Sequence, residues 1–287
     1  MKLGAVYPQI ELGGDPKAIS RLGAALEALG YDHLLAYDHV LGAVHDHREP
    51  PLNGPYTEVD PFHDPLVMFA YLAGQTERIE LATGILVLPQ RQTALVARQA
   101  ADVSLLSGGR LRLGVGVGWN HVEYTALGQD FRTRGARIAE QVELLRRLWT
   151  EPVVTFVGEH HNVDRAGTLP LPAAPIPVWM GGFSQRAFDR ASILADGFIF
   201  SGRRGAVVDQ WAALQRQIED AGRDVSSFGA ERTIRLHEGA AVVAAEAWAW
   251  AESGGTHVSI VSMGLGLDSV EAHIDYFGAV AEQVRAQ

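Results

Sequence analysis

The chain of 287 residues contains no cysteine. Disulfide bonds, thiolate metal sites and a cysteine nucleophile are therefore excluded. Basic residues are also few, since 24 Lys and Arg stand against 34 Asp and Glu, and the formal net charge is −10. This balance argues against nucleic acid and anionic membranes as partners, because both need a basic face.

Long apolar runs and an N-terminal targeting pattern are missing as well. The chain enters directly into Leu3-Gly4-Ala5-Val6 with no basic segment before it, and no apolar run is long enough to cross a bilayer. We therefore expect a cytoplasmic protein that binds neither a membrane nor nucleic acid.

What the chain does contain is a regular alternation of strand-like and helix-period segments. Its 47% hydrophobic content is sufficient for one large core. The strand candidates are residues 3–7, 33–37, 79–86, 111–115, 176–180, 197–201, 232–237 and 256–261. Asp15-Pro16 marks the start of the first helix and Asp64-Pro65 that of the second. Eight β-then-α units predict one α/β domain over residues 1–287, a (β/α)8 TIM barrel.

A doubly wound open sheet is the alternative fold. It would carry a glycine-rich phosphate loop after its first strand, and residues 3–8 have none. Two insertions interrupt the alternation, residues 39–63 after the second strand and residues 153–175 before the fifth. We expect the first to form a loop over the active site and the second to form a hairpin and an extended crossover.

The most informative stretch is residues 110–120, RLRLGVGVGWN, in which an apolar strand ends in alternating glycines. Such glycines remove the side chains from one face of a strand, so a flat ring could lie against the backbone. A second glycine turn, residues 181–184 (GGFS), follows a strand and opens onto a helix. Backbone amides at a helix N-terminus suit a phosphate. A ring site and a phosphate site together favour a flavin-like cofactor.

The carboxyl ends of the strands form the catalytic face of a TIM barrel. This rule selects Asp38 and His39, which follow the second strand, as candidate catalytic residues. It also selects the glycine-containing ends of the third, fourth and fifth strands and three arginines, Arg91, Arg203 and Arg204. From the residues alone, helix caps, flexible turns and solvated arginines explain the same positions.

Five segments, taken in order, resemble the bacterial luciferase-like monooxygenase family. They are residues 31–39 (YDHLLAYDH), 81–89 (LATGILVLP), 109–120, 177–182 (PVWMGG) and 195–197 (ADG). The resemblance implies a TIM barrel that uses coenzyme F420, a deazaflavin, or reduced flavin mononucleotide (FMN). It favours the F420-dependent branch and a reaction that transfers a hydride between F420 and a small organic substrate.

The resemblance also implies the cofactor-binding residues. The third strand would contain a non-prolyl cis peptide bond, Gly84–Ile85, whose bulge supports the back of the ring. The full set is Gly84, Ile85, Gly116, Gly118, Trp119, Asn120, Gly181, Gly182 and Ser184, with the last three at the phosphate. The three arginines named above could meet the acidic tail of F420.

A proton donor is implied near the reactive edge of the ring. The F420-dependent sugar-phosphate dehydrogenases of the family place a glutamate directly after the glycines of the fourth strand, where this chain has Trp119. Glu123 lies about a turn further on. This departure weakens the case for sugar oxidation, and we expect His39, oriented by Asp38, to exchange the proton.

Three other functions are possible. An FMN-dependent monooxygenase fits the same turns, and so does a barrel that binds flavin without catalysis. The third is a metal-dependent hydrolase, because His45 and His47 have the spacing of metal ligands; their proline-rich loop lacks a further ligand and a rigid frame, so we expect no metal site. The expected partners are a small-molecule substrate and, by resemblance, a second copy in a homodimer.

Overall fold

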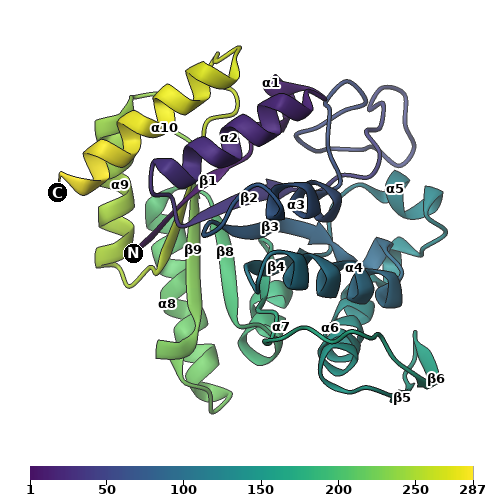
Figure 1. The fold of residues 1–287 in the computed structure, drawn as a ribbon. Helices are drawn as coiled ribbons and strands as arrows, with labels where there is room; N and C mark the ends of the chain where they lie inside the picture. Colours follow the sequence, from purple (N-terminus) through teal and green to yellow (C-terminus); the bar gives the residue numbers. More distant parts are fainter. Residues whose placement is uncertain (287) are drawn as a thin grey trace.

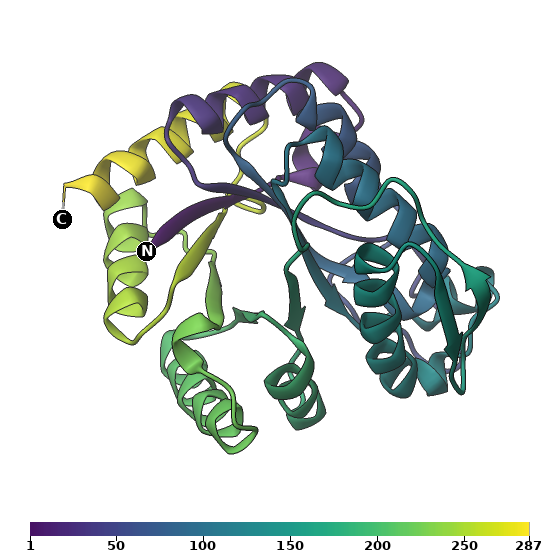
Figure 2. The same cartoon turned by 60° about the horizontal axis from the view of Figure 1, so that its bottom comes forward.

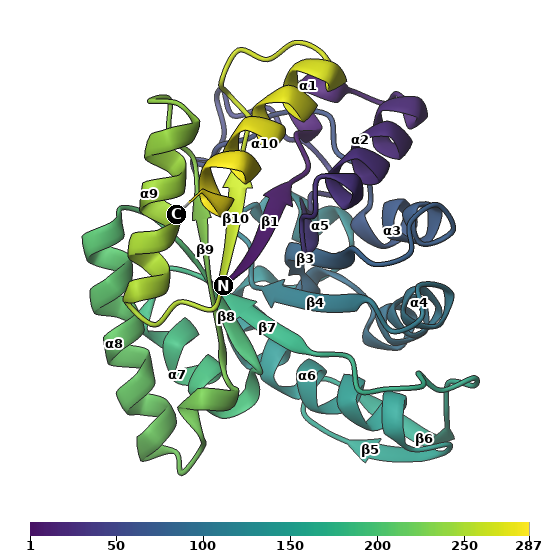
Figure 3. The same ribbon diagram turned by 60° about the vertical axis from the view of Figure 1, so that its left-hand side comes forward.

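The computed structural model describes residues 1–286 and contains one closed barrel. Eight parallel strands follow the order β1-β10-β9-β8-β7-β4-β3-β2, and β1 pairs with both β2 and β10. The strands converge in the centre of Figure 3, with the helices outside them. They are β1 (Lys2–Val6), β2 (His33–Tyr37), β3 (Glu80–Val87), β4 (Leu111–Gly116), β7 (Val178–Gly181), β8 (Gly197–Ser201), β9 (Gly229–Ile234) and β10 (His257–Val261). The predicted TIM barrel is confirmed, and the open sheet is excluded.

Helices surround the barrel and bury their apolar faces against it (Figure 1). They are α1 (Gln9–Leu12), α2 (Pro16–Ala28), α3 (Pro65–Ala73), α4 (Thr93–Leu106), α5 (His121–Ala126), α6 (Arg134–Thr150), α7 (Gln185–Leu194), α8 (Arg204–Asp220), α9 (Ala240–Glu252) and α10 (Val270–Arg285). Short 3-10 helices are η1 (Leu88–Gln90), η2 (Phe131–Thr133) and η3 (Val225–Ser227). The predicted start signals are confirmed: Asp15 accepts from the amide of Lys17, and Asp64 from that of Leu66, both at 2.9 Å.

The second insertion contains the expected hairpin. Residues 153–175 contain the antiparallel hairpin of β5 (Val154–Val157) and β6 (Asn162–Ala166), which lies outside the barrel beside α6 (Figures 1 and 3). Glu140 of α6 holds its turn by accepting from the amide of Glu159 at 2.8 Å and from His161 Nδ1 at 2.6 Å. Residues 39–63 contain neither helix nor strand. They form the open loops at the upper right of Figure 1. These loops lie over the carboxyl ends of the strands, which we call the mouth of the barrel.

One strand was predicted about three residues too late. The seventh barrel strand, β9, spans Gly229–Ile234, whereas the apolar pattern predicted residues 232–237. The missed start contains a glycine that the large ring of Trp179 requires: a Cβ on Gly229 would lie 2.0 Å from that ring, and one on Gly197 would lie 2.4 Å from it. A bare backbone in two adjacent strands makes room for one large ring.

The strands begin at one end of the barrel, which we call the lower end. A charged cluster, the floor cluster, closes this end. Its members are His33, Glu80, Arg112 and Glu231, which point inward from four different strands. Arg112 pairs with both carboxylates and lies over the ring of Trp179, 4.1 Å from its centroid. His33 Nε2 lies 2.7 Å from Glu231 Oε1.

Charge pairing offsets the cost of burying Glu231. Burial by itself raises the pKa of this carboxyl, but the Arg112 guanidinium and His33 outweigh burial and hold the pKa well below its usual range. Ser259 also donates a hydrogen bond to Glu231. Glu231 is therefore ionised, and the floor cluster closes the end of the barrel opposite the mouth.

Candidate active site

His39 lies at the mouth of the barrel inside an aromatic box, which we define as Tyr56, Phe62 and Trp119. Its ring makes edge-to-face contacts with all three, at centroid distances of 5.4, 4.9 and 5.4 Å respectively. Tyr56 and Phe62 come from the long loop, and Trp119 follows β4. The side chain of His39 is 9% exposed. The box therefore encloses the imidazole with apolar surface and fixes its plane.

Glu123 of α5 is the partner of His39. Its carboxylate is buried, and its Oε1 lies 3.2 Å from His39 Nδ1. The same oxygen accepts from the backbone amides of Val40 at 2.8 Å and Leu41 at 3.0 Å. Because the carboxylate accepts at Nδ1, that nitrogen carries the proton. Within residues 1–286 the other ring nitrogen, Nε2, has no hydrogen-bond partner.

The expectation that Asp38 orients His39 is wrong. Asp38 is buried and turned toward Arg91, with Arg91 Nη2 at 2.6 Å from Oδ1 and the amide of Val87 donating to Oδ2 at 2.9 Å. Arg91 Nη1 also reaches Asp64 Oδ2 at 2.9 Å. Burial by itself would lower the pKa of Arg91, but the two carboxylates outweigh it and raise that pKa. Asp38 and Arg91 therefore join the two ends of the long loop.

The predicted cis bond at Gly84–Ile85 is also wrong. Among residues 1–286 the cis peptide bonds are Glu49–Pro50 and Leu169–Pro170. The expected bulge is present, however, because the register of β3 against β4 shifts between Ala82 and Leu86. The bulge absorbs the extra residue with trans peptide bonds throughout.

Glycine at position 84 is required by packing. A Cβ there would lie 2.5 Å from both Leu35 and Tyr37, which point into the barrel. Its neighbour Ile85 is partly exposed at the mouth and packs against two further glycines. A Cβ on Gly116 or Gly181 would lie 2.4 or 2.3 Å from Ile85. The Ile85 side chain therefore covers the bare backbone of these two glycines and forms an apolar platform at the carboxyl ends of β3, β4 and β7.

The second glycine turn opens onto α7 as expected. Gly182 has a φ of +150° and turns the chain, and the following Phe183 is 80% exposed. Ser184 precedes the helix, but its side chain makes no capping hydrogen bond. The first turn of α7 thus lacks a side-chain acceptor, which leaves its amides available to an anion.

Trp119 and Asn120 have different surroundings. Trp119 lines the aromatic box and also packs against the long loop, since a Cβ on Gly54 would lie 2.3 Å from its ring. Asn120 is buried and caps α5: its Oδ1 accepts from the amide of Val122 at 3.1 Å, and its Nδ2 donates to the carbonyl of Leu41 at 3.2 Å. Its contacts hold the loop. Gly118, with a φ of +61°, permits the turn between the strand and this segment.

Glu123 had no predicted role. Helical geometry could have found it, because a residue three positions after a helix cap lies one turn above the helix start. Asn120 is that cap, and Glu123 therefore faces back toward the end of β2. Tyr56 carried no comparable signal, because it lies in an irregular loop.

Other candidate positions do not form a metal centre. His45 Nε2 bonds to the carbonyl of Tyr56 at 3.0 Å, and His47 is exposed. In residues 1–286 no group of three His, Cys, Asp or Glu side chains could hold a metal ion. None of the helices in this part of the chain is both long enough and apolar enough to cross a membrane.

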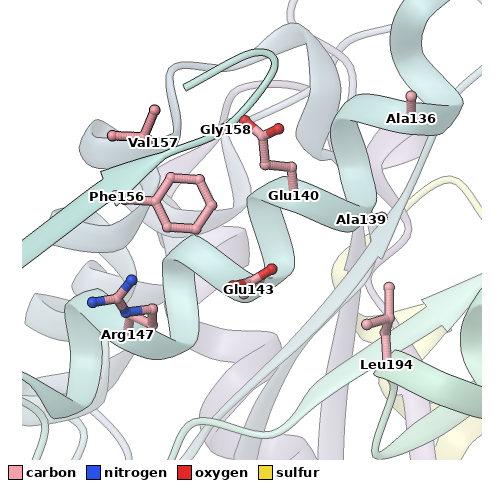
Figure 4. Close-up of a pocket in the computed structure, with 9 residues that line it drawn as sticks. All are labelled: Ala136, Ala139, Glu140, Glu143, Arg147, Phe156, Val157, Gly158 and Leu194. Carbon is pink, nitrogen blue, oxygen red and sulfur yellow. The ribbon is translucent and has the colours of Figure 1, made fainter. Parts of the chain in front are cut away.

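Surface pockets also occur away from the mouth. One of about 470 Å³ lies between α6 and β5, beside Phe156 and Leu194 (Figure 4). Another, of about 460 Å³, lies at the lower end of the barrel under Trp179. Figure 2 gives a second view of the barrel with its surrounding helices. Neither pocket includes His39 or the glycine turns, so the candidate active site rests on the side chains at the mouth.

Known proteins place this architecture in one family. The chain belongs to the luciferase-like monooxygenase family, whose model matches residues 3–282. An uncharacterized protein of Mycobacterium tuberculosis is 33% identical over 207 residues, covering 70% of this chain and 72% of its own. An F420-dependent glucose-6-phosphate dehydrogenase of Nakamurella multipartita is 30% identical over 214 residues. That match covers 72% of this chain and 60% of the dehydrogenase.

Solved structures share the fold. The monooxygenase RslO1 of Streptomyces bottropensis superposes with a TM-score of 0.80 at 18% identity, covering 100% of this chain and 99% of that one. An F420-dependent secondary alcohol dehydrogenase, in complex with an F420-acetone adduct, also gives a TM-score of 0.80, at 17% identity and 99% coverage of both chains.

Proposed function

We propose that this protein is an F420-dependent oxidoreductase that transfers a hydride between the deazaflavin and a small organic substrate. The observation that carries the proposal is the pairing of His39 with Glu123, which leaves one imidazole nitrogen free inside the aromatic box. A protein that only stores a flavin has no use for such an oriented imidazole. The F420-dependent relative at 30% identity supports the choice of cofactor.

The residues at the mouth suit a ring and a phosphate. The Ile85 side chain, which packs on the bare backbone of Gly116 and Gly181, offers an apolar surface for the tricyclic ring. The amides that follow Gly182 suit the phosphate, because Ser184 does not cap them. When bound, the deazaflavin would supply the hydride chemistry. The protein would supply position and the exclusion of water.

The proton would pass through His39 Nε2. Glu123 fixes the tautomer by accepting at Nδ1, so Nε2 can accept a proton from a substrate hydroxyl or, once protonated, return one to a carbonyl. The aromatic box limits access of water to this nitrogen and provides an apolar wall for the substrate. Asp38 would act on this arrangement only through the fold of the loop.

Reduced FMN is the alternative cofactor, because its phosphate fits the same turn, and the reaction would then be a monooxygenation. The monooxygenase of the same fold keeps this alternative open. The apolar enclosure of His39 suits either chemistry.

Titration with both cofactors tests the proposal. The purified protein is titrated with F420 and with FMN, each oxidised and reduced, and binding is followed by fluorescence. Tight binding of F420 with weak binding of FMN supports hydride transfer, and the substrate is then sought by F420 absorbance. Preference for reduced FMN would replace hydride transfer by oxygen activation. Binding of neither cofactor at micromolar concentration would overturn the assignment.

A further inference from the structure

Three arginines gather beside the second glycine turn, and we call them the arginine cluster: Arg134, Arg186 and Arg190. Arg134 opens α6, and the other two lie in the first two turns of α7. The two helices are neighbours in Figures 1 and 3. A Cβ on Gly135 would lie 3.5 Å from Arg190 Nη1, so this guanidinium lies against the first turn of α6.

The cluster has no acidic partner. Within residues 1–286, none of the three guanidinium groups lies within 4.0 Å of a carboxylate. Arg134 lies over the ring of Phe131 at 3.7 Å and donates to that residue's carbonyl, while its Nε is buried without a partner. Burial lowers the pKa of Arg190. The charges of Arg186 and Arg134 lower that pKa further, against the opposite effect of Asp189.

The nearby carboxylates are engaged elsewhere. Asp189 Oδ1 accepts from Gln185 at 2.8 Å and from Gln217 at 3.0 Å. Asp130 accepts from the amide of Arg132 at 2.8 Å. In a chain of net charge −10, three neighbouring arginines without an ion pair are a local excess of positive charge. Such an excess costs free energy in the free protein and is relieved by an anion of several charges.

The sequence suggested other arginines for an acidic ligand, and the structure uses two of them internally. Arg91 pairs with Asp38 and Asp64, and Arg204 pairs with Glu246 at 3.1 Å. The arginine cluster is unpaired and begins two residues after Ser184, at the proposed phosphate turn. It extends from that turn toward α6 and away from the barrel axis.

We propose that the arginine cluster binds an anionic extension of the cofactor, a chain of carboxylates that continues outward from the phosphate on α7. Guanidinium groups match carboxylates in fork geometry and stay charged at any physiological pH. This inference rests on the proposed function and deepens it, because F420 carries a glutamate tail and FMN does not. A second phosphate, as in flavin adenine dinucleotide (FAD), is the other source of the same chemistry.

The test compares cofactors with and without the extension. The wild type is titrated with F420 bearing its glutamate tail and with the tail-less deazaflavin that ends at the phospholactate, in low and in high salt. We expect the tailed form to bind more tightly, and its advantage to shrink in high salt because exposed charge pairs are screened. Equal affinity for the two forms would overturn the inference.

Substitution of the arginines locates the effect. Arg186→Gln, Arg190→Gln and Arg134→Gln should each weaken the tailed cofactor by about two- to fivefold, and the triple variant by roughly tenfold or more. Affinity for the tail-less form should not change. Arg216→Gln removes an exposed arginine from α8 and serves as the matched control. Thermal denaturation checks that every variant is folded.

The outcomes separate this inference from the proposed function. If the tail-less deazaflavin fails to bind the wild type at all, the proposed function fails. If it binds and the triple variant treats both forms like the wild type, only the arginine cluster loses its role. A third outcome has three parts: FAD binds more tightly than FMN, the triple variant removes that preference, and the glutamate tail has no effect. The ligand of the arginine cluster would then be a second phosphate and not a chain of carboxylates.

Discussion

Two histidine–glutamate pairs lie at opposite ends of one strand. His33 begins β2 and pairs with Glu231 at 2.7 Å, while His39 follows the same strand and pairs with Glu123 at 3.2 Å. His33 points into the barrel, whereas His39 lies two residues beyond the end of the strand. The residue types are the same, but the surroundings differ.

The lower pair is enclosed by further charge. Arg112 neutralises Glu231, Ser259 bonds to both members of the pair, and neither side chain is exposed. The upper pair is enclosed by aromatic rings, and the carboxylate takes backbone amides as its other partners. A buried pair surrounded by charge stabilises the fold, whereas a pair with one free nitrogen at a mouth can move a proton.

The largest difference between the pairs should appear in turnover. Replacing His39 by Ala removes the free Nε2, so we expect kcat to fall by about 10²–10⁴-fold while the affinity for the cofactor is kept. F420 absorbance measures turnover, and fluorescence titration measures binding. His47→Asn, at an exposed histidine of the same loop with a φ of +56°, is the control and should be neutral. Turnover retained without His39 would contradict its role.

The next effect belongs to the lower pair and is one of stability. Glu231→Gln leaves Arg112 without its fully buried counter-charge, so the free energy of unfolding should fall by about 3–5 kcal/mol. Urea denaturation measures the loss, and cofactor affinity in the folded fraction should not change. Glu151→Gln, which breaks an exposed pair with Arg147, should have a much smaller effect. A loss no larger than that of the control would show that the floor cluster is not stabilising.

A smaller effect is expected from Glu123→Ala. The alanine removes the oxygen that accepts from His39 Nδ1, so the tautomer is no longer fixed and kcat should fall by up to about 100-fold. Cofactor affinity should stay within about twofold, because Glu123 lies behind the imidazole. The ¹⁵N chemical shifts of His39 should lose the signature of a proton at Nδ1. An unchanged tautomer with unchanged turnover would contradict the positioning role.

The smallest effect is a pH dependence at the lower end. Burial, and then the charges of Arg112 and His33, lower the pKa of His257 to about 3. The unfolded chain binds this proton below about pH 6.5, whereas the folded chain does not until about pH 3. The free energy of unfolding should therefore decline as the pH falls from 6.5, by at most about 1.4 kcal/mol per unit from this group. His257→Gln should flatten the decline between pH 6.5 and 5. Equal slopes for both proteins would contradict the shift.

Local patterns in the sequence were sufficient to predict the barrel. Each strand-and-helix unit is encoded by nearby residues, as at Asp15-Pro16, where cap and first turn are consecutive. The two glycine-rich turns could be predicted in the same way, because the absence of a side chain follows from residue type alone. The rule that catalytic residues follow the carboxyl ends of barrel strands also predicts His39 at the mouth.

Side-chain partners could not be predicted in the same way. Asp38 and His39 are consecutive, yet their side chains have different partners. Asp38 binds Arg91, and His39 contacts Glu123, which lies 84 positions away. The identity of such partners depends on how β2, β4 and α5 are packed. The trans bond at Gly84–Ile85 depends in the same way on neighbouring strands, since the bulge against β4 absorbs the extra residue.

The Arg91 bridge bears on how the substrate pocket of this protein can diverge. Asp38 precedes the long loop and Asp64 follows it, and one guanidinium ties both ends to the barrel. The closure entropy of a loop grows only slowly with its length, by about 0.6 kcal/mol for each doubling. Insertions among residues 46–51, which leave Tyr56 and Phe62 in the aromatic box, would thus cost little stability while changing the walls of the pocket. Changes in this part of the loop could therefore alter which substrates bind while the barrel itself stays the same.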